Sequence, residues 1–433
     1  MKRSVLTLAT CSLALGLVAQ GTWQVTALSD MPEAVSNNAV ASNGTYVYSF
    51  MGIDSTKQFS GIHLKGFRYD IANDTWDTIP SVPDNLTRIA GAASTVNGKI
   101  YVIGGYHVYS NGSEVSSDKV FIYDPVSNIF TSGTDIPVAT DDHVQCVWQD
   151  SLIYVISGWS NTGNILDVQI YDPALDVWMA GSSLPGGNGY EAFGASGVIV
   201  DNTIYFSGGA TDSWVFSMIP KLRTGVINPG DPTVINWSIA DDSLASLYRS
   251  GAGVLEGQPI WLGGADKAYN YDGVEYGTGQ GVEPLNRVTR YDPLTSIISI
   301  ESGAIPAIMD MRGIAQIDSN KYIIAGGMEA DQEVSGKTYL IEHVMTPGLK
   351  ETNTGKKGIA VYPNPASTLL QIRIEEADKL HHWGITDMRG RIVEAGKVTP
   401  NQELNISHLS DGLYALQLTT NARVYTVPFV VAK

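Results

Sequence analysis

The stretch Ile100-Tyr101-Val102-Ile103-Gly104-Gly105 decides the fold of this chain, because close copies of it recur along the sequence. Each copy is an apolar run that ends in a pair of small residues, here called the Gly pair, and the pairs begin 51 to 63 residues apart. The six copies are 46–52 (in degenerate form), 100–105, 153–158, 204–209, 260–264 and 322–327. Self-similarity at this period indicates that one small structural unit is repeated six times.

A second signature, Tyr-Asp-Pro, follows several of these copies, as in Val120-Phe121-Ile122-Tyr123-Asp124-Pro125. Apolar runs with a Gly pair at this period are typical of β-propeller blades. Glycine is expected where neighbouring backbones crowd, and Asp-Pro opens the next turn. These residues resemble the kelch repeat. The resemblance implies an all-β fold with a six-bladed kelch-type β-propeller over residues 22–345.

The last repeat ends soon after Tyr339-Leu340-Ile341 and lacks the segment that completes the other repeats. Thr22-Trp23-Gln24-Val25, at the other end of the propeller sequence, has the apolar and aromatic character of a strand. We therefore expect this N-terminal strand to complete the sixth blade and close the ring, which leaves no bare sheet edge at the junction.

Residues 346–358 contain almost no apolar side chains and read as a linker. Beyond it, residues 359–433 alternate between polar and apolar in short segments, which predicts a small β-sandwich. Three motifs in this segment, Val361 to Ser367, Asp387 to Arg391 and Leu409 to Tyr414, resemble the type A C-terminal sorting domain of the type IX secretion system. The resemblance implies transit through the periplasm, type IX machinery as a partner, and a secreted or outer-surface location.

The first 21 residues have the features of a secretory signal peptide, a positive start followed by an apolar run from Ser4 to Ala19. Cleavage after Ala19 and cleavage after Gly21 both fit. Either removes Cys11 and leaves Cys146 as the only cysteine. We expect no intramolecular disulfide and no transmembrane segment in the mature protein.

Composition restricts the partners. The chain has 433 residues, 43% hydrophobic content and a net charge of -17. This is enough apolar material for large cores, and so acidic a surface makes nucleic acid an unsuitable partner. The sequence has no phosphate loop, nucleophile elbow or clustered Cys/His set, so we expect neither a metal nor a cofactor. Asp141-Asp142 reads as a solvated turn pair.

Four side chains that can carry positive charge precede their Gly pairs by an even number of residues. Arg88 does so by sixteen residues, and His143, Arg249 and Arg312 do so by fourteen. With equivalent hairpins, even offsets give these side chains one orientation, toward the mouth of the central channel. They are candidates either for ligand binding or for bonding to one another around the channel.

Aromatic residues are expected to border the same opening, because the loops after the Gly pairs lie on that face. Tyr106 and Trp159 follow the second and third Gly pairs, and a long insertion at 265–287 carries Tyr269 and Tyr271. Tyrosine and tryptophan among Asp and Gly suit stacking on sugars or peptides. These residues complete the predicted ligand-binding set.

The sequence therefore predicts a secreted or cell-surface binding protein for glycan or protein ligands, with catalysis the less favoured reading. Secreted six-bladed kelch proteins include N-acetylneuraminate epimerases, also called sialic acid mutarotases, and this is the enzyme alternative. Arginines would bind the sugar carboxylate, and Glu191 or His143 would act as acid and base. The third alternative is a scaffold that binds no small ligand.

Overall fold

The computed structural model describes residues 17–187, 189–349, 359–374, 380–387, 391–397, 403–420 and 424–433. Most of the predicted signal peptide, linker residues 350–358 and sorting-motif residues 388–390 lie outside this part of the chain. The chain divides into two compact units, one of them Trp23–His343 and the other containing Val344–Lys433. Each is described by itself. No helix among the described residues is long and apolar enough to cross a membrane.

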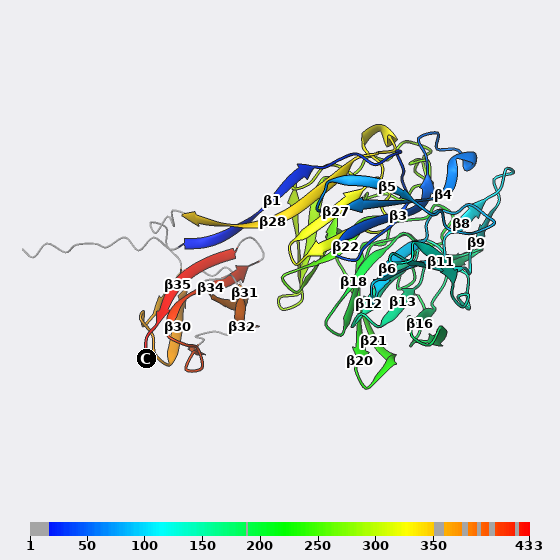
Figure 1. Cartoon of the computed structure of the whole chain (residues 1–433). Coiled ribbons are helices and arrows are strands. Elements are labelled where there is room, and N and C mark those ends of the chain that lie inside the picture. Colours follow the sequence, from blue (N-terminus) through cyan, green and yellow to red (C-terminus); the bar gives the residue numbers. More distant parts are fainter. Residues whose placement is uncertain are drawn as a thin grey trace, which may run out of the picture. The chain divides into compact units, whose positions relative to one another are not determined.

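The first unit contains six four-stranded antiparallel sheets, the blades of a propeller (Figure 1). Blade one consists of β2 (Ala39–Ser42), β3 (Tyr46–Ile53), β4 (Ile62–Asp70) and β5 (Thr75–Ile79). Blade two consists of β6 (Ala92–Val96), β7 (Lys99–Ile103), β10 (Val120–Asp124) and β11 (Ile129–Ser132). Blade three consists of β12 (Val144–Trp148), β13 (Leu152–Ile156), β16 (Val168–Asp172) and β17 (Val177–Ala180).

The remaining blades have the same order. Blade four consists of β18 (Ser196–Val200), β19 (Thr203–Ser207), β20 (Lys221–Asn228) and β21 (Asp231–Asp241). Blade five consists of β22 (Gly251–Leu255), β23 (Gln258–Leu262), β24 (Arg287–Asp292) and β25 (Ile297–Ser302). Blade six consists of β26 (Ala315–Asp318), β27 (Lys321–Ala325), β28 (Thr338–Leu349) and β1 (Leu17–Ala27). The predicted all-β, six-bladed fold is confirmed.

The N-terminal strand β1 is the outer strand of blade six. The sheet order β1-β28-β27-β26 places it beside β28 (Figure 1). The blade thus combines residues from both ends of the propeller sequence, and its fourth strand fills the edge that the last repeat leaves open. Such pairing holds the ring closed through backbone hydrogen bonds.

The Gly pairs link each blade to the next. The second glycine of a pair donates its N–H to a backbone carbonyl of the following blade, as Gly105 does to Thr140 at 3.0 Å and Gly209 does to Leu247 at 2.7 Å. A Cβ on Gly208 would lie 1.9 Å from the Leu247 carbonyl oxygen, and Gly208 has a φ of +70°. Glycine is therefore required by close approach and by backbone conformation together, and the predicted crowding is confirmed.

Apolar cores lie between neighbouring blades. Tyr123 and Tyr171, from the Tyr-Asp-Pro signature, are fully buried in two of these cores. Anchor residues lie between blades as well, and the Trp178 indole donates to the Thr134 carbonyl at 2.8 Å. The repeat signatures are therefore structural, because they pack one blade against the next.

The second unit is a small β domain around its own core. One sheet has the order β29-β30-β33 and the other β32-β31-β34-β35. The strands are β29 (Ile359–Tyr362), β30 (Leu369–Ile374), β31 (Leu380–Asp387), β32 (Ile392–Lys397), β33 (Glu403–Asn405), β34 (Gly412–Thr420) and β35 (Val424–Val431). Leu370, Ile385, Leu416 and Phe429 are fully buried in this core.

Candidate ligand-binding site on the loop face

One face of the propeller, the loop face, carries the connections that follow the Gly pairs. These are η1 (Phe59–Gly61), hairpin β8 (Tyr106–Val108) with β9 (Glu114–Ser116), hairpin β14 (Trp159–Ser160) with β15 (Gly163–Asn164), loop 210–218, insertion 265–287 and η3 (Ala330–Gln332). Isolated bridges such as Ile89–Tyr106 and Tyr248–Ala265 tie these connections to the segments that enter the first strands. Both sets of segments therefore meet on one face.

Six equivalent residues form a ring at the start of the first strands. All six have φ between +45° and +69°, and they are Asn37, Ala90, Asp142, Gly194, Arg249 and Asp310. Backbone bonds run from one blade to the next, as from Gly194 N–H to the Asp142 carbonyl and from Arg249 N–H to the Gly194 carbonyl, both at 2.8 Å. The ring fixes where each of its side chains starts.

The side chains at this ring form a buried polar cluster, here called the hub, of Asn37, Asp142, His143, Arg249, Asp310 and Arg312. Arg249 donates from Nε and Nη2 to both oxygens of Asp142, at 3.0 and 2.6 Å, and from Nη1 to Asp310 at 2.9 Å. Paired charges of this kind tolerate burial because each of the three guanidinium nitrogens donates to a carboxylate oxygen.

Arg312 extends from blade six to blade three. Its Nη2 donates to the His143 carbonyl oxygen at 2.6 Å, and its Nη1 lies 3.4 Å from Asp142 Oδ1. Burial acts to raise the pKa of Asp142, but the charges of Arg249 and Arg312 outweigh it and lower that pKa. Asp142 is thus a carboxylate shared by two arginines.

Two residues that flank Asp142 in the chain, His143 and Asp141, favour their neutral forms. Burial, followed by the neighbouring Arg312 charge, lowers the pKa of His143 to about 4. Burial and the adjacent Asp142 carboxylate raise the pKa of Asp141 well above its usual value, and Ser116 donates a hydrogen bond to Asp141 at 2.6 Å. The sequence interpretation of Asp141-Asp142 as a solvated turn pair was wrong, because both residues are buried.

An aromatic layer covers the hub on the loop face. The Tyr248 and Tyr269 rings lie 5.2 and 5.5 Å from the Arg249 guanidinium carbon, and Tyr269 Oη accepts a hydrogen bond from the Asp310 N–H at 2.8 Å. Trp159, Phe193, Phe216 and Tyr276 continue this layer through ring contacts. The hub arginine is therefore held by carboxylates below and by rings above.

The structure brings together only some of the predicted ligand-binding residues. Arg249, Arg312 and His143 meet at the hub, and Tyr269, which is fully buried, touches Arg249. Trp159 belongs to the aromatic layer. Tyr106, 5% exposed, and Tyr271 pack in a neighbouring cluster with residues of blades one and two, from which Tyr106 still interacts electrostatically with Arg249.

Arg88 and Glu191 are not at the hub. Arg88 donates to the Gly104 carbonyl at 2.7 Å and pairs with Asp84 at 2.8 Å, so the shared orientation predicted from even spacing was wrong for it. Arg88 precedes Ala90, the ring residue of its blade, by two residues, whereas Arg249 is itself a ring residue. In blade four, Arg223 makes the equivalent bond to the Gly208 carbonyl at 2.6 Å. Burial lowers the pKa of Arg223 to about 9, and the charge of Glu191 acts against that shift.

Beneath Arg312 the central channel contains a small polar cavity of about 110 Å³. His143, Gln145, Ser196, Ser250 and Arg312 contribute its polar lining. Gln145 donates to Ser94 at 2.9 Å and Ser196 to the Ser250 carbonyl at 2.6 Å. A cavity of this size and polarity suits a few water molecules.

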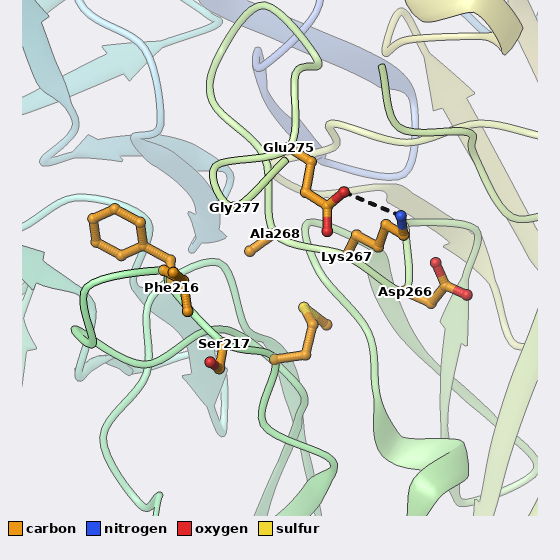
Figure 2. A pocket seen from close by; sticks show the side chains of 9 residues that line it. Phe216, Ser217, Asp266, Lys267, Ala268, Glu275 and Gly277 are labelled. Carbon is orange, nitrogen blue, oxygen red and sulfur yellow. Dashed lines mark hydrogen bonds and ion pairs between the residues drawn. The ribbon is translucent and has the colours of Figure 1, made fainter. Parts of the chain in front are cut away.

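A larger pocket of about 330 Å³, here called the rim pocket, lies on the loop face between blades four and five (Figure 2). It is lined by Val215, Phe216, Ser217 and Met218 from one loop and by Asp266, Lys267, Ala268, Glu275 and Gly277 from the insertion. Figure 2 shows Phe216 and Ser217 on one side and the charged residues on the other. Lys267 Nζ donates to Glu275 Oε2 at 3.1 Å.

Trp214 directly precedes the pocket-lining residue Val215 in the chain and is 99% exposed. Its neighbour Val215 lines the pocket and is 53% exposed. A fully exposed indole is uncommon, and tryptophan is one of the residues enriched at binding surfaces.

Sequence reasoning missed Trp214, Asp266, Lys267 and Glu275. The available signal was the composition of the blade-four loop, Thr211-Asp212-Ser213-Trp214, in which one large aromatic stands among small polar residues. It also misread Asp142 as a solvated turn residue and did not single out Asp310, because charge pairing between distant blades leaves no local pattern in the sequence. Among the described residues, no group of three His, Cys, Asp or Glu side chains is placed to hold a metal ion.

Comparison with known proteins identifies both units. Residues 88–137 match the kelch motif, and residues 360–432 match the secretion system C-terminal sorting domain. The solved structure titled "Structure of YjhT" aligns with 81% of this chain and 99% of its own residues. The TM-score is 0.57 and the sequence identity is 14%, which supports the fold.

Sequence relatives point the same way. Beta-scruin of Limulus polyphemus is 30% identical over 203 residues, 46% of this chain and 21% of its own. Kelch-like protein terF of Aspergillus terreus is 26% identical over 205 residues, 44% of this chain and 42% of its own. The matched region thus spans less than half the length of either relative.

The first unit is a kelch-repeat β-propeller with a closed hub and an open rim pocket. More specifically, this chain joins that propeller to a type IX secretion C-terminal sorting domain. The sorting domain indicates a secreted or outer-surface protein, as the sequence predicted.

Proposed function

We propose that this chain is a binding protein whose glycan or protein ligand docks on the loop face at the rim pocket and Trp214. The observation that carries the proposal is the 99% exposure of Trp214 on the loop that contributes Val215 to a pocket of about 330 Å³. Exposed tryptophan at a concave site supplies a large contact area at little entropic cost. We also propose that residues 1–21 are a cleaved signal peptide that delivers the chain to the type IX machinery.

The contacts at the hub fit a structural role better than a catalytic one. An epimerase-like site needs arginines that are free to bind a sugar carboxylate, whereas Arg249 and Arg312 share Asp142 as a partner. The expected acid, Glu191, lies in the field of Arg223. A ligand carboxylate would therefore have to displace a buried carboxylate already in place, at high cost.

A scaffold that binds no ligand does not account for the exposed Trp214 side chain. A chain that only spaces other parts gains nothing from an indole surrounded by water, which favours unwanted association. The acidic surface of the chain, with a net charge of -17, keeps it soluble despite such a residue.

The test is a binding screen with the full chain. It is applied to a glycan array and to immobilised outer-surface proteins, alongside Trp214→Ala and the control Leu175→Ala. Leu175 is 69% exposed in the turn between β16 and β17, on the face opposite the loop face. We expect saturable binding that only Trp214→Ala weakens.

Two results would contradict the proposal. Equal binding by both variants would mean that the ligand does not bind at Trp214 on the loop face. Acceleration of sialic acid anomer exchange by the full chain, abolished by Arg249→Ala, would establish the enzyme alternative instead.

A further inference from the structure

We infer that the rim pocket binds one uncharged sugar ring of a glycan and discriminates against anionic sugars. This inference rests on the proposed function and narrows it to one class of ligand. The pocket has two unlike walls (Figure 2). The blade-four loop contributes a mainly apolar wall, with the Phe216 ring turned away from the charged side chains, and the blade-five insertion contributes a charged one. A sugar ring has the same division, because its C–H face is apolar and its hydroxyls project from the edge.

The charged wall disfavours anionic ligands. Asp266 and Glu275 are acidic and Lys267 is basic, so the lining carries a net charge of about -1 at neutral pH. An anionic sugar would be repelled by the carboxylates. A cationic side chain would be repelled by Lys267. Lys267 lies 3.1 Å from Glu275 and is already the positive partner of that carboxylate.

The same wall is well suited to hydroxyl groups. Carboxylate oxygens accept hydrogen bonds from sugar hydroxyls, and the Lys267 ammonium donates to their lone pairs. Hydrogen bonds from Thr278 and then Lys267 lower the pKa of Glu275, so this carboxylate stays ionised and remains an acceptor. Charge-assisted hydrogen bonds are the stronger kind, which favours a ligand with several hydroxyls.

The apolar wall is held in place before a ligand arrives. The Phe216 ring lies 4.5 Å from Tyr276 and 5.7 Å from Trp159, centroid to centroid. Backbone bonds from Phe216 to Ser213 and from Thr211 to Ser217, both at 2.9 Å, close the loop that carries it. A preformed apolar surface costs little ordering entropy on binding.

The size of the pocket restricts the ligand to a short one. A volume of about 330 Å³ lies at the lower end of the roughly 300–1,000 Å³ typical of small-molecule sites. Trp214, two residues before Phe216 and 99% exposed, adds an aromatic surface outside the pocket. We assign the pocket to one ring and Trp214 to a neighbouring ring of the same glycan.

The test uses the full chain on an array of neutral gluco-, galacto-, manno- and xylo-oligosaccharides printed beside their sialylated and sulfated counterparts. The tightest neutral binder is then titrated by calorimetry against Trp214→Ala and Asp266→Asn. Asp331→Asn is the matched control, since Asp331 is an exposed loop-face carboxylate outside the pocket lining. Thermal melting of each variant checks that it is folded.

We expect neutral glycans to bind at least about 10-fold more tightly than their charged counterparts, because a buried unpaired charge is costly. Asp266→Asn should weaken binding about 10-fold, the effect of losing a hydrogen bond to a charged group, and Asp331→Asn should leave it unchanged.

Three results would overturn the inference. They are a preference for sialylated or sulfated glycans, neutral binding that neither Trp214→Ala nor Asp266→Asn weakens, and silence of the whole array. If the array is silent and a surface protein binds in a Trp214-dependent way, the proposed function stands and only the sugar assignment fails. If that protein binding is also insensitive to Trp214→Ala, both fail.

Discussion

The hub and the rim pocket are both polar sites on the same face, yet they differ in what their charges do. At the hub, the Arg249 guanidinium is hydrogen-bonded to Asp142 and Asp310, and the residue is 1% exposed. At the rim pocket, Lys267 and Asp266 are exposed, and Trp214 is in water. Charges that satisfy one another hold a ring together, whereas groups with spare capacity are available to a ligand.

This difference separates structural from functional residues better than residue type does. Arginine, aspartate and tyrosine at a channel mouth suggest a ligand site, but here they close the channel. The site that remains open is built from a short loop and an insertion, which the propeller positions. Each prediction below tests this division.

The largest expected effect is at the hub. Asp142→Ala removes the carboxylate that Arg249 and Arg312 share and leaves buried positive charge without its partner. We expect a loss of about 3–5 kcal/mol in the free energy of unfolding, measured by urea denaturation. Asp266→Ala, the pocket carboxylate, should change stability by less than about 0.5 kcal/mol. Similar losses for the two variants would erase the distinction between the two sites.

The next effect tests the backbone under the hub. Gly208→Ala places a Cβ 1.9 Å from the Leu247 carbonyl oxygen, at a φ of +70°. We expect a loss of about 3 kcal/mol, from strain and displaced backbone together. Gly257→Ala is the matched control, because its φ is +75° and nothing lies within 4 Å of its Cβ. It should cost about 1 kcal/mol, the conformational part alone. Equal losses would mean that crowding between blades contributes nothing.

At the rim, binding should change while stability does not. Trp214→Ala is expected to weaken the ligand found in the screen by about 2 kcal/mol, the size of a binding hot spot. The melting temperature should stay within about 1 °C of the parent chain, since Trp214 is 99% exposed. A large drop in melting temperature would instead make Trp214 a structural residue.

The last effect depends on pH. The pKa of Asp141 is raised in the folded state, mainly by burial, so its favourable contribution is complete below the unfolded pKa and is lost as pH rises through the folded value. Asn does not ionise, so the Asp141→Asn variant does not lose this stability as the pH rises. The variant should therefore gain stability relative to the parent chain by about 1.4 kcal/mol per pH unit above the unfolded pKa of roughly 3.9, until the folded pKa is reached.

Urea unfolding of the two chains at pH 5 and pH 8 measures this difference. The pH dependence of His143, whose pKa is lowered to about 4, is common to both chains and cancels. A difference that is the same at both pH values would mean that Asp141 is ionised in the folded protein.

Much of the fold could be read from local patterns. The Gly pairs, exemplified by Gly104-Gly105, and the buried Tyr123 and Tyr171 mark features that repeat with every blade, so six copies reinforce one interpretation. The site does not repeat. Arg88 and Arg249 have similar places in the sequence, but one binds a carbonyl between blades and the other two carboxylates at the hub.

Spacing along the chain was enough to predict the number of blades, the strand that completes the ring and the C-terminal sorting domain. Only the tertiary structure decided that Asp142 meets Arg249, 107 residues away, and that Tyr269 is buried over it while Trp214 is not. Those outcomes depend on which side chains from different blades reach the same point. Burial and charge pairing are properties of that shared space, and no single repeat contains them.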